Sequence, residues 1–349
     1  PEVEREIQDR IKGLAGEELA IFLYPGSSSD IPDDKRLKLA VISPNYGVKD
    51  LASQKFLQEL LTKHGSGFRV YKNTLVFGVA DSGEYEGLKR AVRRLLALRE
   101  IRNDKDFVKA LSEENKRVLE QKLKDAESDI PVRILSTYRQ LAKGSKDGLE
   151  FLDMGIPTIG EKPNLSKRVK EYLKLQDKLL ERVSAKYVME RALAEGEEQK
   201  EFKEIYETFL KSPDLPMIES EEVIRSAIVD GVKNKNLGVV VGDRLHYGEE
   251  ISKPIVSPEA LILVSGIAEQ QAKGWGPVVE TRKEGVIVEP RPVGAKVSRL
   301  NIKARVPWDK LSSLVSGVFR PLQQEGAKIT LQVEISAESD AGISKDTID

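Results

Sequence analysis

The sequence predicts a multidomain protein of the α/β plus α+β class, and three observations support this prediction. Its 349 residues exceed the size at which a single hydrophobic core stops growing. Its first part alternates short apolar runs with amphipathic helical patterns, which is typical of a mainly parallel sheet with a layer of helices on each face. Its middle part is mainly helical, and its last part is rich in short strands.

Three apolar runs predict the strands of the first domain at residues 20–24, 37–42 and 74–80, and a shorter run predicts a fourth strand at 132–135. Between these runs apolar residues recur at three- and four-residue spacing, which predicts helices. The predicted helices of this domain span residues 49–63, 84–102 and 105–127. We therefore assign residues 1–150 to a three-layer α/β domain.

Helical patterns dominate the middle of the chain. A helix predicted at residues 165–194 makes residues 151–197 a helical linker. The elements expected next are helices at residues 198–211 and 219–233 and strands at 237–241 and 244–247. A two-residue turn with Gly242 joins the two strands into a hairpin. Helices followed by a hairpin resemble a winged helix, so we predict a winged-helix-like domain at 198–270 and a small β-rich α+β domain at 277–349.

The composition excludes several classes of protein. Lys and Arg number 56 and Asp and Glu 57, a balance that argues against a dedicated nucleic-acid or membrane-surface protein. Because the chain has no cysteine and only two histidines, we expect neither disulfides nor a transition-metal site. No apolar run approaches the roughly 20 residues that cross a bilayer, and the charged first residues are unlike a signal peptide. We expect a cytoplasmic protein without a membrane partner.

Catalytic motifs are absent from the sequence. No glycine-rich loop ends in Gly-Lys-Ser/Thr, since the segment from Gly65 to Gly67 lacks the lysine. The nucleophile motif Gly-x-Ser-x-Gly is also absent. We therefore expect no complete catalytic site and no bound cofactor in this chain. Because the sequence begins at Pro1 without a methionine, we expect it to be part of a longer polypeptide.

Polar loops follow the three main predicted strands. If these strands are parallel neighbours, the loops meet at one edge of the sheet, where ligands of α/β proteins bind. The candidate residues at this edge are Ser28, Asp30, Asn45, Asp81 and Ser82. One interpretation is a site for a phosphate, a cation or a partner, or a hydrolase site with Asp81 as its charged residue. The other is that Asp81 or Ser82 caps the following helix and that the remaining residues turn the chain.

A basic face is predicted on the helix that begins near Glu84. Four cations lie there at helical spacing, away from the apolar stripe, and they are Lys89, Arg90, Arg93 and Arg94. Such a face can contact the phosphates of a nucleic acid or an acidic partner. The alternative is an ordinary solvated helix face.

The predicted winged helix suggests DNA binding, because its last helix can enter a major groove. Here that helix begins with Glu219, Glu221 and Glu222, whose carboxylates would repel phosphates. We therefore favour a protein-interaction role for this domain. His246 and Tyr247 in the hairpin are interpreted as packing residues.

Several stretches together are familiar: residues 27–34, which lead into the predicted strand at 37–42, residues 71–81, and the terminal helix at 307–324. They resemble the region downstream of the ATPase core in large prokaryotic AAA-type ATPases of a family of unknown function, often encoded beside DNA methyltransferases in phage-defence islands. The resemblance implies that ATP and Mg²⁺ bind in a part of the protein upstream of this chain. It also implies a protein partner, such as a DNA methyltransferase, or DNA itself.

Overall fold

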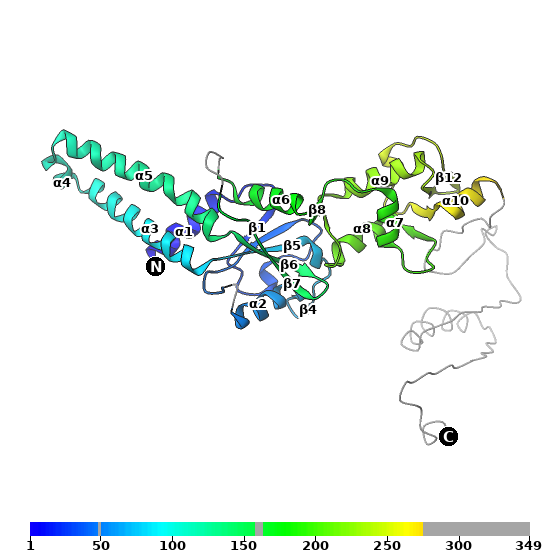
Figure 1. Ribbon diagram of the computed structural model, residues 1–349, viewed down its shortest axis with the longest axis horizontal. Coiled ribbons are helices and arrows are strands. Elements are labelled where there is room, and N and C mark those ends of the chain that lie inside the picture. Colours follow the sequence, from blue (N-terminus) through cyan, green and yellow to red (C-terminus); the bar gives the residue numbers. More distant parts are fainter. Residues whose placement is uncertain (48–49, 158–162, 275–349) are drawn as a thin grey trace, which may run out of the picture. The chain divides into compact units, whose positions relative to one another are not determined.

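The computed structural model describes residues 1–47, 50–157 and 163–274, which belong to one compact unit. They form a mixed α/β structure with a mainly parallel five-stranded sheet and a four-stranded antiparallel sheet (Figure 1). No helix in these ranges combines the length and the hydropathy needed to span a bilayer. The α+β domain predicted at 277–349 lies outside the described residues.

The five-stranded sheet has the order β1-β2-β5-β6-β7. Its strands are β1 (Ala20–Leu23), β2 (Lys38–Val41), β5 (Leu75–Val79), β6 (Gln140–Ser145) and β7 (Gly148–Asp153). The first three are parallel, and their register pairs Phe22 with Ala40 and Ala40 with Phe77. The prediction that these three strands are co-directional neighbours is therefore confirmed. Strand β6 runs antiparallel to β5, and β7 runs antiparallel to β6.

Alternating side chains of β2 divide the core into two layers. Leu39 and Val41 point to one face of the sheet and Ala40 and Ile42 to the other. The first face is covered by α1 (Glu2–Gly13), α3 (Ser82–Asn103), α5 (Glu113–Thr137) and α6 (Leu165–Leu175). The second face is covered by α2 (Leu51–Thr62), with the short hairpin of β3 (Lys63–His64) and β4 (Gly67–Phe68) after it. Helices thus cover both faces of the sheet (Figure 1).

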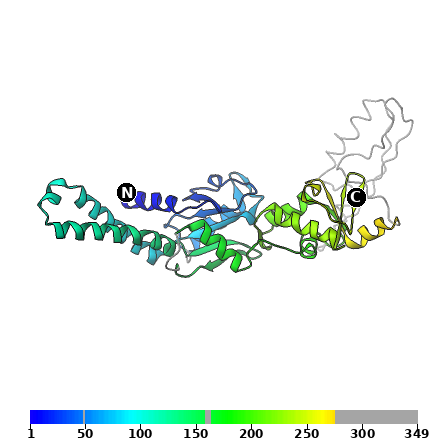
Figure 2. The same cartoon turned by 90° about the horizontal axis from the view of Figure 1, so that it is seen from above.

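A helical arm formed by α3, α4 (Lys105–Ala110) and α5 extends beyond the sheet (Figures 1 and 2). Its two long helices pack along each other through α3 residues such as Leu95 and α5 residues such as Leu123. Near the base, Arg99 donates to the carboxylates of Glu6 and Glu127, each at 2.9 Å. This ion pair network ties the arm to α1.

Two predictions for the arm are wrong. Residues 132–135 are not a strand but belong to α5, because Ala126, Ile130 and Ile134 continue its buried face at helical spacing. The helix predicted at 105–127 is interrupted after α4, where Ser112 caps the start of α5 by accepting from the Asn115 amide. Pro131 lies inside α5.

Two further predictions needed correction. The single helix predicted at 165–194 is α6, then β8 (Leu179–Leu180), then α7 (Ala185–Ala192). The interruption follows from Asp177, whose φ of +53° ends the helix, and from Ser184, which caps α7. The β6–β7 hairpin was not predicted, although the Asp147-Gly148 sequence where its turn meets β7 is a hairpin signal and Gly148 has a φ of +115°.

The second half of the described chain is built on the antiparallel sheet of order β12-β11-β13-β9. Its strands are β9 (Gln199–Glu201), β11 (Leu237–Val241), β12 (Arg244–His246) and β13 (Leu261–Val264). Its helices are α7, α8 (Phe202–Lys211), α9 (Glu221–Lys233) and α10 (Ser265–Ala272). The β11–β12 hairpin was predicted and is confirmed. A short parallel pair, β8 with β10 (Met217–Ile218), precedes α9.

The end of α8 packs against the segment that precedes β5 and against β6. Asn73, in the short helix η2 (Lys72–Thr74), donates to the carbonyls of Phe209 at 2.9 Å and Leu215 at 3.0 Å. Gly144 of β6 lies so close to this segment that a Cβ there would be 2.7 Å from the Pro213 side chain. Glycine at 144 and asparagine at 73 therefore fix the end of α8 against the five-stranded sheet.

Candidate functional site

The carboxyl ends of β1, β2 and β5 lie at one edge of the sheet because these strands are parallel and adjacent. A backbone bridge between Gly47 and Ala80 brings the loop after β2 to the loop after β5. A Cβ on Gly47 would lie 3.4 Å from Ser82 Oγ. The structure therefore brings the Asn45 loop close to Asp81 and Ser82.

Ser28 and Asp30 lie in the short helix η1 (Ser28–Asp30), which is held elsewhere. The Ser28 carbonyl accepts from the buried guanidinium of Arg69, which also binds the carbonyls of Ile31 and Leu60. Asp30 accepts from the amides of Gly26 and Ser27 and so stabilises its own loop. No hydrogen bond or ion pair between described residues links this segment to Asp81.

Asp81 is engaged in two structural contacts. Its carboxylate caps α3 by accepting from the amides of Gly83 at 3.0 Å and Glu84 at 3.2 Å. It also receives a hydrogen bond of 3.2 Å from Arg139. Burial opposes ionisation, but these donors outweigh it and hold the pKa of Asp81 below its ordinary value. The carboxylate is therefore a stably ionised cap and not a poised base.

Residues that sequence analysis missed complete this edge of the sheet. Gln140 donates to Asp153 at 2.6 Å, and Arg139 Nε lies 4.0 Å from the same carboxylate. Arg139, Gln140 and Asp153 flank or belong to the β6–β7 hairpin, whose Asp-Gly turn was the only signal for them. The charged groups of Asp81, Arg139 and Asp153 are therefore paired with one another.

Two tyrosine hydroxyls meet below this edge. Tyr24 and Tyr138 lie 2.9 Å apart at their Oη atoms, in a hydrogen bond that links the end of β1 to the residue after α5. Burial raises the pKa of Tyr24 to about 12 and that of Tyr138 well above its ordinary value. Both phenols remain protonated at neutral pH, so they link the structure and do not act as bases.

The predicted basic residues lie on α3 in the arm. Lys89 forms an ion pair with Glu86 and places its Nζ 5.1 Å from the centre of the Tyr85 ring. Arg90, Arg93 and Arg94 are exposed on the side of α3 opposite its buried stripe. None of these three arginines forms an ion pair with a carboxylate of the described residues. The arm therefore presents three unpaired guanidinium groups within little more than one helical turn.

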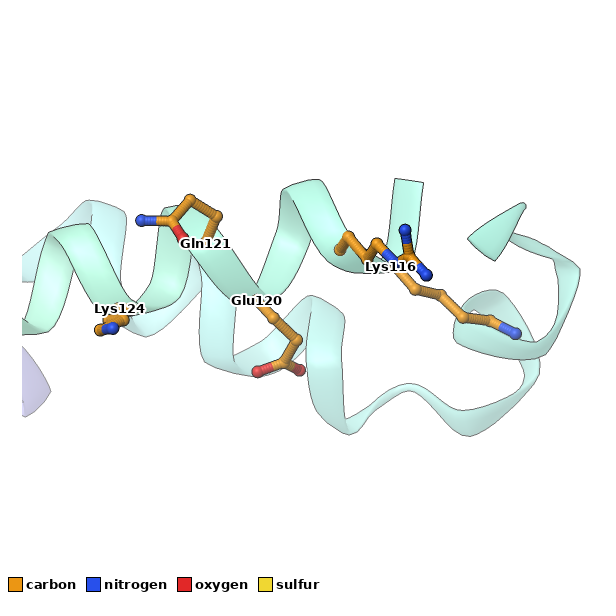
Figure 3. Close-up of a pocket in the computed structure, with 5 residues that line it drawn as sticks. Lys116, Glu120, Gln121 and Lys124 are labelled. Carbon is orange, nitrogen blue, oxygen red and sulfur yellow. The ribbon is translucent and has the colours of Figure 1, made fainter. Parts of the chain in front are cut away.

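The outer end of the arm exposes apolar side chains. Phe107 is 50% exposed, Val118 44% and Ile101 40%. Beside them, α5 carries a shallow hollow lined by polar residues that include Lys116, Glu120, Gln121 and Lys124 (Figure 3). Exposed aromatic and aliphatic residues on a projecting element are typical of a protein-interaction surface. We name Ile101, Phe107 and Val118 the arm tip.

Helix α9 contrasts with a DNA-reading helix. Glu221 and Glu222 at its start form ion pairs with Arg225, whose guanidinium also packs on the Phe202 ring. One face of the helix is buried through residues such as Ile224 and Ile228, and its exposed side chains include the carboxylates of Glu222 and Asp230. His246 in the hairpin is buried, as predicted, and its Nδ1 lies 2.6 Å from Glu249.

Comparison with known proteins assigns no function to this site. Among the described residues, no group of three or more histidine, aspartate or glutamate side chains is arranged to hold a metal ion. No family model, no curated protein and no solved structure matches this chain. The geometry defines a mixed α/β protein with a projecting helical arm.

Proposed function

We propose that this chain is a non-catalytic interaction and regulatory region of a larger AAA-type ATPase, in which the arm binds a protein partner. The observation that carries the proposal is the arm tip, where three apolar side chains are exposed on an element that projects from the sheet. The sheet edge supports the same conclusion because its charged groups are used to cap and to pair. ATP and Mg²⁺ would bind in an upstream part.

The order of elements in the second half supports a winged-helix-like module in this proposal. The elements follow in the order α7, β9, α8, β10, α9, β11, β12 and β13, which is the order of a winged helix with the short strands β10 and β12 added. We therefore propose that the module starts at α7. The carboxylates of Glu221 and Glu222 at the start of α9 favour a protein over a DNA groove as its partner.

The test measures binding between the purified chain and a DNA methyltransferase, the class of partner that the resemblance implies, by biolayer interferometry. We expect Phe107→Asp to weaken binding at least about tenfold, because a charge replaces a central apolar contact. The matched control is Val132→Asp, which changes a 43%-exposed apolar residue near the base of α5. Equal affinities for Phe107→Asp and the unaltered chain would reject the arm tip as the binding surface. No binding of the unaltered chain would reject this partner.

A second candidate function is nucleic-acid binding through Arg90, Arg93 and Arg94. The observation that favours it is the absence of any ion pair for these three exposed guanidinium groups within the described ranges. Each phosphate contact adds about 0.9 to the slope of log affinity against log salt. Reversal of all three arginines to glutamate would therefore reduce this slope by about 2–3, in a DNA mobility-shift titration at several salt concentrations.

The matched control for this candidate changes three exposed cations on the other long helix of the arm, Arg117, Lys122 and Lys124. If both triple reversals reduce the slope equally, binding depends on net charge and not on the α3 face. If the unaltered chain does not shift DNA at low salt, this candidate is rejected.

A further inference from the structure

A cleft of about 710 Å³ lies away from the arm, where the first domain meets the segment after α8. Its walls are the β6–β7 hairpin, the turn between α6 and β8, and residues 213–216. The volume is in the range that small-molecule sites occupy. The polar groups of this cleft have no role in the function proposed above.

The buried amine of Lys143 lines the inner wall of the cleft. Only 3% of this residue is exposed, and its Nζ donates to the carbonyls of Gly144 at 2.6 Å and Pro213 at 3.5 Å. An ammonium has three hydrogens to donate, and the second of these two bonds is long. No carboxylate of the described residues lies within 4.0 Å of this Nζ, although Glu150 and Asp214 act on it electrostatically.

Lys38 shows how this chain otherwise accommodates a buried lysine. It is fully buried, and its Nζ donates to two backbone carbonyls and to Thr74 Oγ1, and it pairs with the Asp34 carboxylate at 3.0 Å. A buried cation without such a partner is costly. Burial also lowers the pKa of Lys143. An acceptor from within the cleft would supply the bond that Lys143 lacks.

Carboxylates gather at the mouth of the same cleft. Asp147, Asp177 and Asp214 line it, are exposed, and form no ion pair with a described residue. Glu150 is already paired with Lys178 at 2.5 Å. The cleft is therefore cationic at its buried wall and, with Lys146 as one exposed cation, mainly anionic at its opening.

We propose that this cleft binds a small zwitterion, a molecule whose carboxylate bonds Lys143 and whose ammonium lies among the three aspartates at the mouth. Free amino acids and short amino carboxylic acids belong to this class. This arrangement of charges would favour a zwitterion over a ligand with one charge. A simple carboxylate would be repelled by the aspartates at the mouth, and a simple amine would give Lys143 no acceptor.

Calorimetric titration of the whole chain tests the proposal with matched probes. The zwitterions are glycine, 4-aminobutanoate and 6-aminohexanoate, and the controls are hexanoate and cadaverine, which each carry only one kind of charge. We expect at least one zwitterion to bind about tenfold or more tighter than either control, since hydrogen bonds to charged groups contribute at least that factor. No zwitterion binding, or equal affinity for cadaverine, would overturn the proposal.

Two variants then locate the site. Lys143→Met should abolish the preference for zwitterions over cadaverine, and Asp214→Asn should weaken zwitterion binding several-fold. Asp230→Asn, an exposed carboxylate on α9, is the control and should change nothing. If Lys143→Met lowers stability, Asp214→Asn still decides, since its residue is exposed. Unchanged zwitterion affinity in Asp214→Asn and Lys143→Met would show that Lys143 has a structural role only.

Discussion

Replacement of Asn73 by alanine should loosen the end of α8 and little else. The Asn73 amide serves two buried carbonyls, those of Phe209 and Leu215, while its own Oδ1 has no hydrogen-bond partner. Alanine therefore removes two donated bonds and no accepted one. Each carbonyl left without a donor costs about 1–3 kcal/mol, so we expect the loss to be about 2–6 kcal/mol.

Hydrogen exchange measured by mass spectrometry is the suitable assay, because a chain of this size need not unfold in one step. The amides of α8 should exchange faster in Asn73→Ala, whereas those of α3 should keep their protection. Asn73→Asp should have a larger effect, since a carboxylate would face both carbonyls. Asn45→Ala, at an exposed loop position, is the control. A change below about 1 kcal/mol at α8 in Asn73→Ala would refute the reasoning.

Three other predictions concern the first domain. Arg69→Met should lower the unfolding free energy by about 3–5 kcal/mol, because buried main-chain carbonyls lose a charged donor; a urea midpoint like that of the unaltered chain would contradict this. The pKa of Asp34 is raised by burial but lowered more strongly by hydrogen bonds from Arg36 and Lys38, and it falls to about 2. Its unfolded pKa is near 3.9, so its stabilisation should be present above about pH 4 and be lost as the pH falls toward 2; acid titrations of Asp34→Asn should lack this component. Asp81→Ala should cost about 1 kcal/mol through the lost cap of α3 and leave any phosphatase or nuclease activity unchanged, whereas a loss of such activity would restore the hydrolase interpretation.

The sequence predicted the parallel part of the main sheet because β2 and β5 are buried along their whole length and β1 beside them is half-buried. Each of β1, β2 and β5 is a short, nearly continuous apolar run. Such a run predicts a strand from local sequence alone, without knowledge of its neighbours in the fold. The β6 strand is different, since Lys143, Gly144 and Ser145 follow its two apolar residues. Lys143 is buried there because Gly144 admits the Pro213 segment, and this contact between distant residues leaves no periodic pattern.

The candidate site was predicted only where local sequence determines the contact. One of the two interpretations of this edge was that Asp81 or Ser82 caps the next helix, which local sequence suggests because capping needs only the next three residues, and the cap is Asp81. Its partner Arg139 is 58 residues away, and the pairing depends on how β6 returns beside β5. The exposure of Phe107 also depends on tertiary structure, because α4 packs Val108 against the core and leaves Phe107 half exposed.

The proline in α5 bears on how force would pass along the arm. Pro131 has no amide hydrogen, so it cannot donate to the Glu127 carbonyl one turn earlier. Glu127 is also the residue whose carboxylate Arg99 of α3 holds. If a partner pulled on Phe107, we would expect α5 to bend most easily at the turn that lacks this backbone hydrogen bond. The Arg99 ion pair joins α3 to α5 at the same turn. Bending there would therefore first disturb the bond between Arg99 and Glu6 of α1.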